Sequence, residues 1–304
     1  MMSVAELEAA QIQLEQPTGG LWHEAWYRLT HNVGAIIGGV LVALFVVAAL
    51  GAQWIAPAHP SNETFLIGGI LKPEPPSLDH LLGLDIQGRD VFSRIVYGAR
   101  YSLLIGVVSV SIGLSIGVLL GSIAGFVGGY IDALVMRLMD IMLAVPGLLF
   151  AIAIVAMLGA GLWQVMVAVG VVNIPIFARL LRGSVLAQRD NDYVLAARAV
   201  GVPRRRILFS HILPNAMSPV IVQGTLAMAT AIIDVAGLGF LGLGPQDPST
   251  PEWGTMLTDV NEYLAAAPYL AIIPGLAIVI SVLGFNLIGD GLREALDPKL
   301  RGRA

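Results

Sequence analysis

The sequence predicts an all-α integral membrane protein with six transmembrane helices. Hydrophobic residues make up 56% of its 304 residues and charged residues only 12%, whereas soluble domains average roughly 45–50% and about 25%. Six long apolar segments alternate with polar ones, and each is long enough to cross roughly 30 Å of hydrocarbon as a helix of about 20 residues. The 35 glycines agree, because glycine lets neighbouring membrane helices approach closely.

The first 56 residues are expected to form a cytoplasmic tail and one span. Residues 1–32 open on acidic, polar sequence and end in LWHEAWYRLTHN, whose aromatic residues suit an amphipathic segment at the level of the lipid headgroups. This stretch lacks the apolar core of a cleaved signal peptide. Residues 33–56 carry no charge and predict the first transmembrane helix.

Residues 57–100 are expected to form an extracytoplasmic loop. Five prolines in its first half oppose regular backbone pairing. Its second half indicates a short amphipathic helix on the membrane surface, with Val91, Ile95 and Phe92 on the apolar side.

Residues 101–292 are expected to form a core of five helices. In the first of these helices, glycines and serines recur at near-helical spacing, which predicts a face for close helix packing. Pro146 and Pro175 fall inside later spans, where proline frees a backbone carbonyl and bends the helix. The five spans are predicted at about residues 101–126, 133–158, 162–181, 216–243 and 268–288.

The distribution of Lys and Arg predicts the orientation. With the N-terminus in the cytoplasm, 13 of the 17 basic residues lie on cytoplasmic segments and 4 lie outside, as the positive-inside rule favours. Residues 293–304 are then a cytoplasmic tail, and residues 183–215 form a cytoplasmic loop.

The stretch from Asp192 to Asn215 in this loop is too basic to enter the bilayer, although long apolar runs flank it. A basic, helix-prone segment between two spans predicts a docking element for a cytoplasmic partner. Gly201–Pro203 is expected to join two short helices, because Gly permits a turn and Pro is favourable at the start of a helix. The basic residues are Arg198, Arg204, Arg205, Arg206 and His211.

This stretch resembles the EAA loop of ABC importer membrane subunits. The family pattern is Glu-Ala-Ala, three residues, Gly, nine residues, and an ending of an apolar residue, any residue, Leu and Pro. Ala196, Ala197, Gly201 and Leu213–Pro214 match this spacing. Leu195 stands where the family has Glu, so the polar contact that this Glu would make is not expected here.

Other segments resemble the peptide/nickel subfamily of these permeases. Tyr193 and HILPN at residues 211–215 are similar to this subfamily, and residues 81–106 are similar to the N-terminal signature of its C-type subunits. MRLMDIMLAVP and Asp234 in AIID are most similar to the C-type permease subunits of dipeptide importers. The resemblance covers about residues 22–302.

The resemblance implies a type I ABC importer permease fold in the bacterial cytoplasmic (inner) membrane. The implied partners are a homologous second permease, two ATP-binding subunits, an extracytoplasmic substrate-binding protein and membrane lipid, with no nucleic acid. The chain itself would be no enzyme and need no cofactor, because ATP hydrolysis belongs to the partners. The implied cargo is dipeptides or short oligopeptides, with nickel and glutathione as alternatives.

The resemblance also implies an ATPase-subunit interface on the loop. Val194, Ala197 and Val200 are expected to enter a groove of the ATPase subunit, while Arg204 to Arg206 face either the rim of that groove or lipid phosphates. The interface residues implied are Tyr193, Ala196, Ala197, Gly201, Arg204, Arg205 and Pro214.

Carboxylates inside spans are functional candidates by default. Asp140 and Asp234 are candidates for the translocation path, although Arg137, three residues before Asp140, is an alternative partner for it. Asp234 has no neighbouring cation in the sequence, and Asp290 is expected at the interface beside Arg293.

Two other classes of function are compatible with the sequence, an intramembrane enzyme with Asp140 and Asp234 as a carboxylate pair and an ion channel subunit. The chain has no cysteine, and its five histidines lack metal-ligand spacing, so no metal site is predicted. GLGFLGLG at residues 237–244 lacks the GK[ST] ending of a phosphate-binding loop.

Overall fold

The structure is a computed structural model that describes residues 21–59, 63–65, 72–247 and 250–296. The regular structure of these residues is helical, as predicted, and extended pairing among them is limited to isolated bridges at Leu84. The predicted tails at residues 1–20 and 297–304 lie outside the described residues. In chain order the elements are α2 (Leu21–His31), α3 (Val33–Ile55), α4 (Val91–Val127), α5 (Gly129–Leu143), α6 (Gly147–Leu158), α7 (Leu162–Arg189), α8 (Asp192–Ala199), α9 (Arg204–Arg206), the π-helix η1 (Ile207–Ile212), α10 (Leu213–Ala216), α11 (Ser218–Phe240), the 3₁₀-helix η2 (Thr255–Tyr263) and α12 (Tyr269–Leu296).

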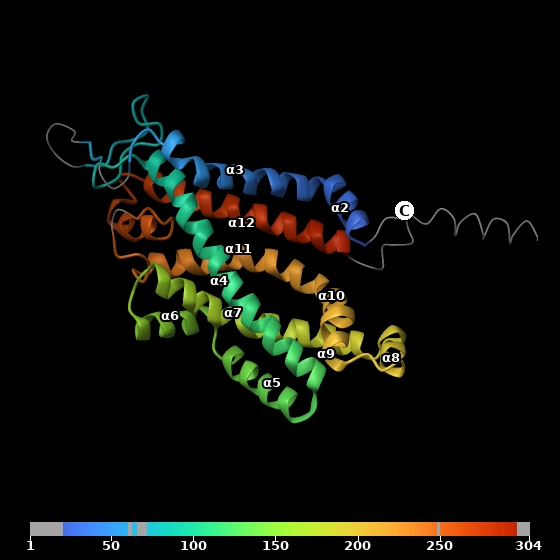
Figure 1. Cartoon of the computed structure of the whole chain (residues 1–304). Coiled ribbons are helices and arrows are strands. Elements are labelled where there is room, and N and C mark those ends of the chain that lie inside the picture. The colour runs from blue at the N-terminus through green and yellow to red at the C-terminus, as the bar shows by residue number, and fades with distance from the viewer. Residues whose placement is uncertain (1–20, 60–62, 66–71, 248–249, 297–304) are drawn as a thin grey trace, which may run out of the picture.

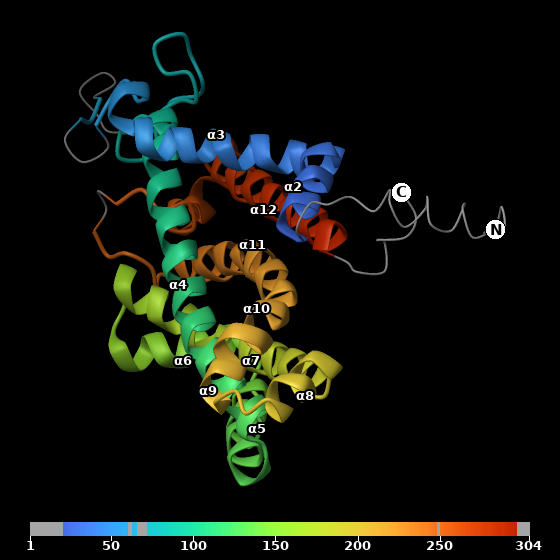
Figure 2. The same ribbon diagram turned by 45° about the vertical axis from the view of Figure 1, so that its right-hand side comes forward.

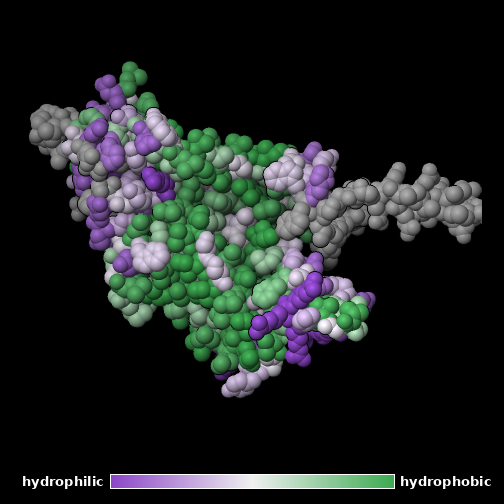
Figure 3. Space-filling view, viewed as in Figure 1, coloured by the Kyte–Doolittle hydropathy of each residue, from purple (hydrophilic) through white to green (hydrophobic). Residues whose placement is uncertain are grey.

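Five helices, α3, α4, α7, α11 and α12, are long and apolar enough to cross a membrane. The pair α5 and α6 also qualifies, but a bend of 90° separates the two helices, so they form either a broken span or a re-entrant loop. The described residues therefore provide five spans, or six if the bent pair is one span. Figure 3 shows a broad apolar surface between two hydrophilic ends, as hydrocarbon requires.

The packing of α4 against α7 forms the centre of the fold (Figure 1). A Cβ atom added to Gly117 of α4 would lie 2.5 Å from the Cβ of Phe177, and one added to Gly113 would lie 2.7 Å from the Cβ of Asn173. Only glycine permits this approach of the two backbones. The predicted stripe of small residues is thus confirmed as a helix-packing face.

Helix α3 packs on α12 at the outside of the bundle, and the two helices lie side by side in Figure 1 and Figure 2. A Cβ atom on Gly38 of α3 would lie 2.7 Å from the carbonyl oxygen of Gly284. Asn32 caps α3 by accepting a hydrogen bond from the N–H of Ala35 at 2.9 Å, and it donates one to Glu294 of α12 at 2.6 Å. Small residues and this cap therefore join the N-terminal span to the last helix.

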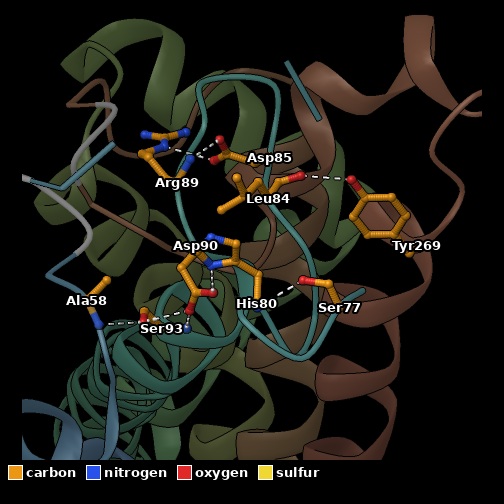
Figure 4. Close-up of polar contacts among 9 residues, drawn as sticks. All are labelled: Ala58, Ser77, His80, Leu84, Asp85, Arg89, Asp90, Ser93 and Tyr269. Carbon is orange, nitrogen blue, oxygen red and sulfur yellow. Dashed lines mark hydrogen bonds and ion pairs between the residues drawn. The ribbon is translucent and has the colours of Figure 1, made fainter. Parts of the chain in front are cut away.

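A buried polar cluster attaches the loop between α3 and α4 to the start of α4 (Figure 4). The Asp85 carboxylate accepts a hydrogen bond from Nε of Arg89 at 2.8 Å and forms an ion pair with Arg94. Asp90 caps α4, because its carboxylate accepts hydrogen bonds from the N–H and the hydroxyl of Ser93 at 2.8 and 2.7 Å. The cluster satisfies charges that a helix inserted alone would leave unpaired.

Several helix boundaries differ from the predicted ones. Helix α4 begins at Val91 rather than near residue 101, so the prediction of a separate surface helix was wrong, because the Asp90 cap starts one continuous helix there. Helix α7 continues to Arg189 and α12 to Leu296, beyond the predicted ends at residues 181 and 288. Polar partners and water let these helices extend past their apolar segments.

Candidate functional site

Residues 192–216 fold into a helical hairpin, here called the 192–216 hairpin, at the end of the bundle opposite the loop before α4 (Figure 1, Figure 2). Helix α8 ends at Ala199, and Gly201 turns the chain with a φ of 79°. The N–H groups of Gly201 and Val202 donate hydrogen bonds of 3.0 Å to the carbonyls of Arg198 and Ala197. The predicted turn between two short helices is therefore confirmed.

The inner face of the hairpin is anchored in the main hydrophobic core. Val194 and Ala197 of α8 are buried in the same cluster as Ile207 and Ile212 of η1 and Val185 of α7. The expectation that Val194 and Ala197 enter a groove of a partner was therefore wrong, because these side chains pack inside their own chain. They hold the hairpin on the end of α7 instead.

The outer face of the hairpin is exposed and mixes apolar with basic groups. Val200 is 79% exposed and Leu195 is 48% exposed, and Ala196 is exposed between them in the chain. The exposed residues of the second arm include Arg204, Arg205, Arg206, Phe209 and Pro214. Apolar side chains beside cations at a helix-turn suit docking to another protein.

Polar contacts fix the two arms of the hairpin to each other and to α7. The Tyr193 hydroxyl donates a hydrogen bond to Oε1 of Gln188 at 2.8 Å and lies 3.4 Å from the carbonyl oxygen of His211. Asn215 donates to the same carbonyl at 2.8 Å. The second arm contains the π-helix η1, a geometry that is frequent at functional sites. Motion of the hairpin would thus be transmitted to α7 through a packed and hydrogen-bonded contact.

A cavity of about 730 Å³ opens between the hairpin and the end of α4. Its lining includes Arg189, Arg198 and Arg204 together with Asp190 and the turn at Gly201. Three guanidinium groups beside one carboxylate give this cavity a positive charge. An anionic group, including a lipid phosphate, fits it electrostatically.

The structure gives Asp140 a different partner from the one predicted. Asp140 of α5 forms an ion pair with Arg179 of α7, not with Arg137 on its own helix. A second ion pair joins the same two helices, in which Arg182 donates from Nε and Nη2 to Asp132 at 3.0 and 2.6 Å. Sequence spacing missed both pairs because their partners are 39 and 50 residues apart.

The other two predicted carboxylates lie on different helices. Asp234 is partly buried in the last third of α11, and Gly237, three residues later, faces Leu148 at the start of α6. Asp290 is exposed near the end of α12, as is Arg293. Asp140 and Asp234 therefore come from separate helices, and the carboxylate of Asp140 is engaged by a guanidinium.

Glu252 in the loop after α11 is a buried carboxyl that sequence analysis missed. Its two oxygens accept hydrogen bonds from the N–H groups of Gly254 and Thr255, both at 2.8 Å. Burial raises the pKa of Glu252 to about 7, although these hydrogen bonds counteract part of the increase. The adjacent Trp253 is fully buried and donates to the carbonyl of Ile95 at 3.2 Å, so this loop is anchored on α4.

Comparison with known families agrees with the fold and the hairpin. Residues 117–302 match the model of the binding-protein-dependent transport system inner membrane component. Residues 20–73 match the N-terminal TM domain of oligopeptide transport permease C. The first match covers more than half of the chain and includes the whole 192–216 hairpin.

Curated relatives are similar over nearly their full length. The chain is 47% identical to the dipeptide transport system permease protein DppC of Alkalihalophilus pseudofirmus, covering 92% of this chain and 90% of the relative. It is 49% identical to the di/tripeptide transport system permease protein DppC of Pseudomonas aeruginosa, covering 92% and 93%. It is also 48% identical to the glutathione transport system permease protein GsiD of Shigella flexneri, covering 92% and 91%.

Solved structures of the MetNI methionine ABC transporter, titled as inward-facing conformations, share the fold. One chain aligns with a TM-score of 0.57 and 20% identity, covering 68% of this chain and 97% of that chain. The all-helical architecture is thus that of a type I ABC importer permease. On the family match and these relatives, the chain belongs to the family of binding-protein-dependent transport system inner membrane components.

Proposed function

We propose that this chain is the permease subunit that forms half of the translocation path of an ATP-driven importer of dipeptides or short oligopeptides. The observation that carries the proposal is the 192–216 hairpin, an exposed helix-turn element anchored on α7 and included in the family match. The 47–49% identity to dipeptide and di/tripeptide permeases supports the peptide cargo.

Glutathione is a second candidate cargo. The glutathione permease of Shigella flexneri is as similar to this chain as the dipeptide permeases are. Glutathione is itself a short peptide with a free ammonium group and free carboxylates, so the same path accommodates both. Substrate selection between them then belongs to the extracytoplasmic binding protein.

The outer face of the 192–216 hairpin is proposed as the site that contacts an ATP-binding subunit. Ala196 and Val200 present small and apolar surface, and Arg204 and Arg205 add charge at its edge. Gly201 supports the site by shaping the turn. Two further residues hold this outer face in position, because Tyr193 hydrogen-bonds to α7 and Ala197 packs into the core. Pro214 lies beside the same face.

The complete importer is proposed to contain a homologous second permease, two ATP-binding subunits and an extracytoplasmic binding protein in the bacterial cytoplasmic membrane. ATP hydrolysis belongs to the ATP-binding subunits. Both termini and the hairpin lie in the cytoplasm, which the excess of Lys and Arg on these segments supports. The basic cavity beside the hairpin is then positioned for the phosphates of cytoplasmic-leaflet lipid.

Reconstitution of the importer in proteoliposomes tests the proposal. The chain is combined with the second permease, the ATP-binding subunits and the binding protein from the same source, and uptake of labelled dialanine and labelled glutathione is measured with and without ATP. ATP-dependent uptake of dialanine is expected. Uptake of glutathione alone would assign the second cargo, and uptake of either that needs no ATP would contradict the importer.

A further inference from the structure

The ion pair between Asp140 and Arg179 lies on an exposed part of an apolar surface. The two side chains are 49% and 48% exposed, and Leu138, Ile141 and Val145 beside them are exposed as well. A charged side chain facing lipid within the hydrocarbon region is unfavourable. In the assembled importer, this face is therefore expected to contact a water-filled path or another protein subunit rather than hydrocarbon.

The pair lies toward the cytoplasmic side of the membrane. The end of α4, which leads into α5, lies beside the end of α7, where Nη1 of Arg189 lies 3.5 Å from the carbonyl oxygen of Gly125. With a rise of 1.5 Å per residue, Asp140 is ~16 Å from the start of α5 and Arg179 is ~15 Å from the end of α7. Helix α7 extends past its apolar segment, which ends near residue 181, so the pair lies in the part of the roughly 30 Å hydrocarbon that is nearest the hairpin.

Broken helices surround the same position. The 90° bend between α5 and α6 follows four residues after Asp140, and Pro175 interrupts the hydrogen bonding of α7 one turn before Arg179. Interrupted helices within the membrane line substrate paths in transporters, because irregular backbone is tolerated only beside protein or water.

The second ion pair between α5 and α7, formed by Asp132 and Arg182, has the features of a structural contact, unlike the pair formed by Asp140 and Arg179. Arg182 and Asp132 share two hydrogen bonds, and their side chains are only 35% and 17% exposed. Asp140 and Arg179 share a single hydrogen bond, and no further bond of either side chain is recorded among the described residues. Each thus keeps donors or acceptors that are available to a ligand.

We propose that Asp140 and Arg179 bind the charged termini of the peptide as it crosses the membrane. Arg179 would exchange Asp140 for the peptide carboxylate, and Asp140 would bind the peptide ammonium group. Arg137, exposed one turn before Asp140, adds positive charge that favours the carboxylate. A zwitterionic peptide thereby replaces one ion pair by two, so its charges remain paired while it is within the membrane.

This inference rests on the proposed function, and the reconstituted importer tests it first through transport. The neutral variant Asp140→Asn with Arg179→Gln keeps a hydrogen-bonding amide at both positions but removes both charges. Dialanine uptake per ATP hydrolysed is expected to fall about tenfold, the effect of losing a charge-assisted hydrogen bond. In the matched control, Asp132→Asn with Arg182→Gln, dialanine uptake per ATP hydrolysed is expected to equal that of the wild type when both are normalised to the amount of inserted subunit. An unchanged ratio in the first variant would overturn the inference.

The second test uses labelling, because the chain has no cysteine of its own. In the Ile141→Cys variant, which places a thiol beside Asp140 on the same exposed surface and leaves both charges in place, the anionic reagent 2-sulfonatoethyl methanethiosulfonate is expected to react with the new thiol. Dialanine with the binding protein and ATP is expected to slow this reaction about tenfold during turnover. A reaction rate that dialanine does not lower would overturn the inference. So would the absence of any reaction in every nucleotide state, because a subunit contact would then cover the pair. Failure of the wild-type importer to take up dialanine would instead contradict the proposed function.

Discussion

A Cβ atom on Gly117 of α4 would lie 2.5 Å from the Cβ of Phe177 on α7, so the two central helices are in contact along their backbones. No rearrangement of one side chain alone relieves that contact, since another atom, the carbonyl oxygen of Ile174, would lie at 2.8 Å. The α4–α7 pair is therefore the rigid part of the fold, against which the hairpin and the bent pair α5–α6 are placed.

The Gly117→Val variant is expected to separate α4 from α7 and to destabilise the protein by about 1–3 kcal/mol, the usual effect of overpacking. The control is Gly183→Ala on α7, where an added Cβ meets no atom within 4 Å. Thermal unfolding of both variants in detergent measures the difference. Equal melting temperatures would show that α4 and α7 are not in close contact.

Gly201 is expected to tolerate Asn but not Val. Its φ of 79° is in the left-handed region, which Asn adopts far more readily than a β-branched residue does. Steric conflict is not the cause, because an added Cβ would meet no atom within 4 Å. Uptake by the Gly201→Val variant is expected to fall about tenfold while its amount in the membrane is unchanged. Comparable uptake by both variants would exclude a need for this turn in coupling.

Single cysteines in the first arm of the 192–216 hairpin test which face of the hairpin contacts the ATP-binding subunit. Val200 is 79% exposed whereas Val194 is fully buried, although both belong to the same short segment. The Val200→Cys variant is therefore expected to form cross-links with the ATP-binding subunit through a bifunctional thiol–amine reagent, and the Val194→Cys variant is not. If neither variant forms a cross-link in an importer that still transports, the outer face of the hairpin does not contact the ATP-binding subunit.

Leu195 occupies the position of the family Glu, and it is 48% exposed. The Leu195→Glu variant is expected to retain wild-type uptake, because no buried neighbour is displaced and the carboxylate remains in water. Val194→Glu, one residue away, is expected to reduce the amount of folded protein, since an unpaired charge would be buried in the core. Immunoblots of membranes and uptake assays distinguish the two. A severe loss in Leu195→Glu would show that this position needs an apolar side chain.

Glu252 is expected to make stability depend on pH. Burial raises its pKa from 4.5 to about 7, so the folded state binds the proton more tightly than the unfolded state does. This contribution is fully present below pH 4.5 and is lost as the pH rises through 7, with a total on the order of 3 kcal/mol.

Thermal unfolding between pH 5 and 8 checks this dependence. The melting temperature of the wild type is expected to fall with rising pH over this range, and the Glu252→Gln variant is expected to lose most of that slope. Glu63→Gln, which alters an exposed carboxylate, is the control. A slope that persists in Glu252→Gln would assign the titration to another group.

Much of the architecture was predictable from local sequence. Apolar segments longer than the hydrocarbon is thick identify the spans, and the spacing of Gly113 and Gly117 identifies the packing face of α4. The φ of Gly201 follows from the turn between two short helices. These features depend on residues that are neighbours in the chain or on one helix face, which is why the printed sequence reveals them.

Other features depended on tertiary contacts between distant segments. Spacing predicted Arg137 as the partner of Asp140, but the fold brings Arg179 to it from another helix. Likewise, the resemblance to the EAA loop placed Val194 in a groove of a partner, although the core of this chain buries it. Periodicity determines which residues share one face of a helix, whereas the packing of whole helices determines what that face meets. For this chain, sequence alone predicted the spans and the turn of the hairpin, and only the tertiary structure decided which charges pair and which surfaces remain exposed.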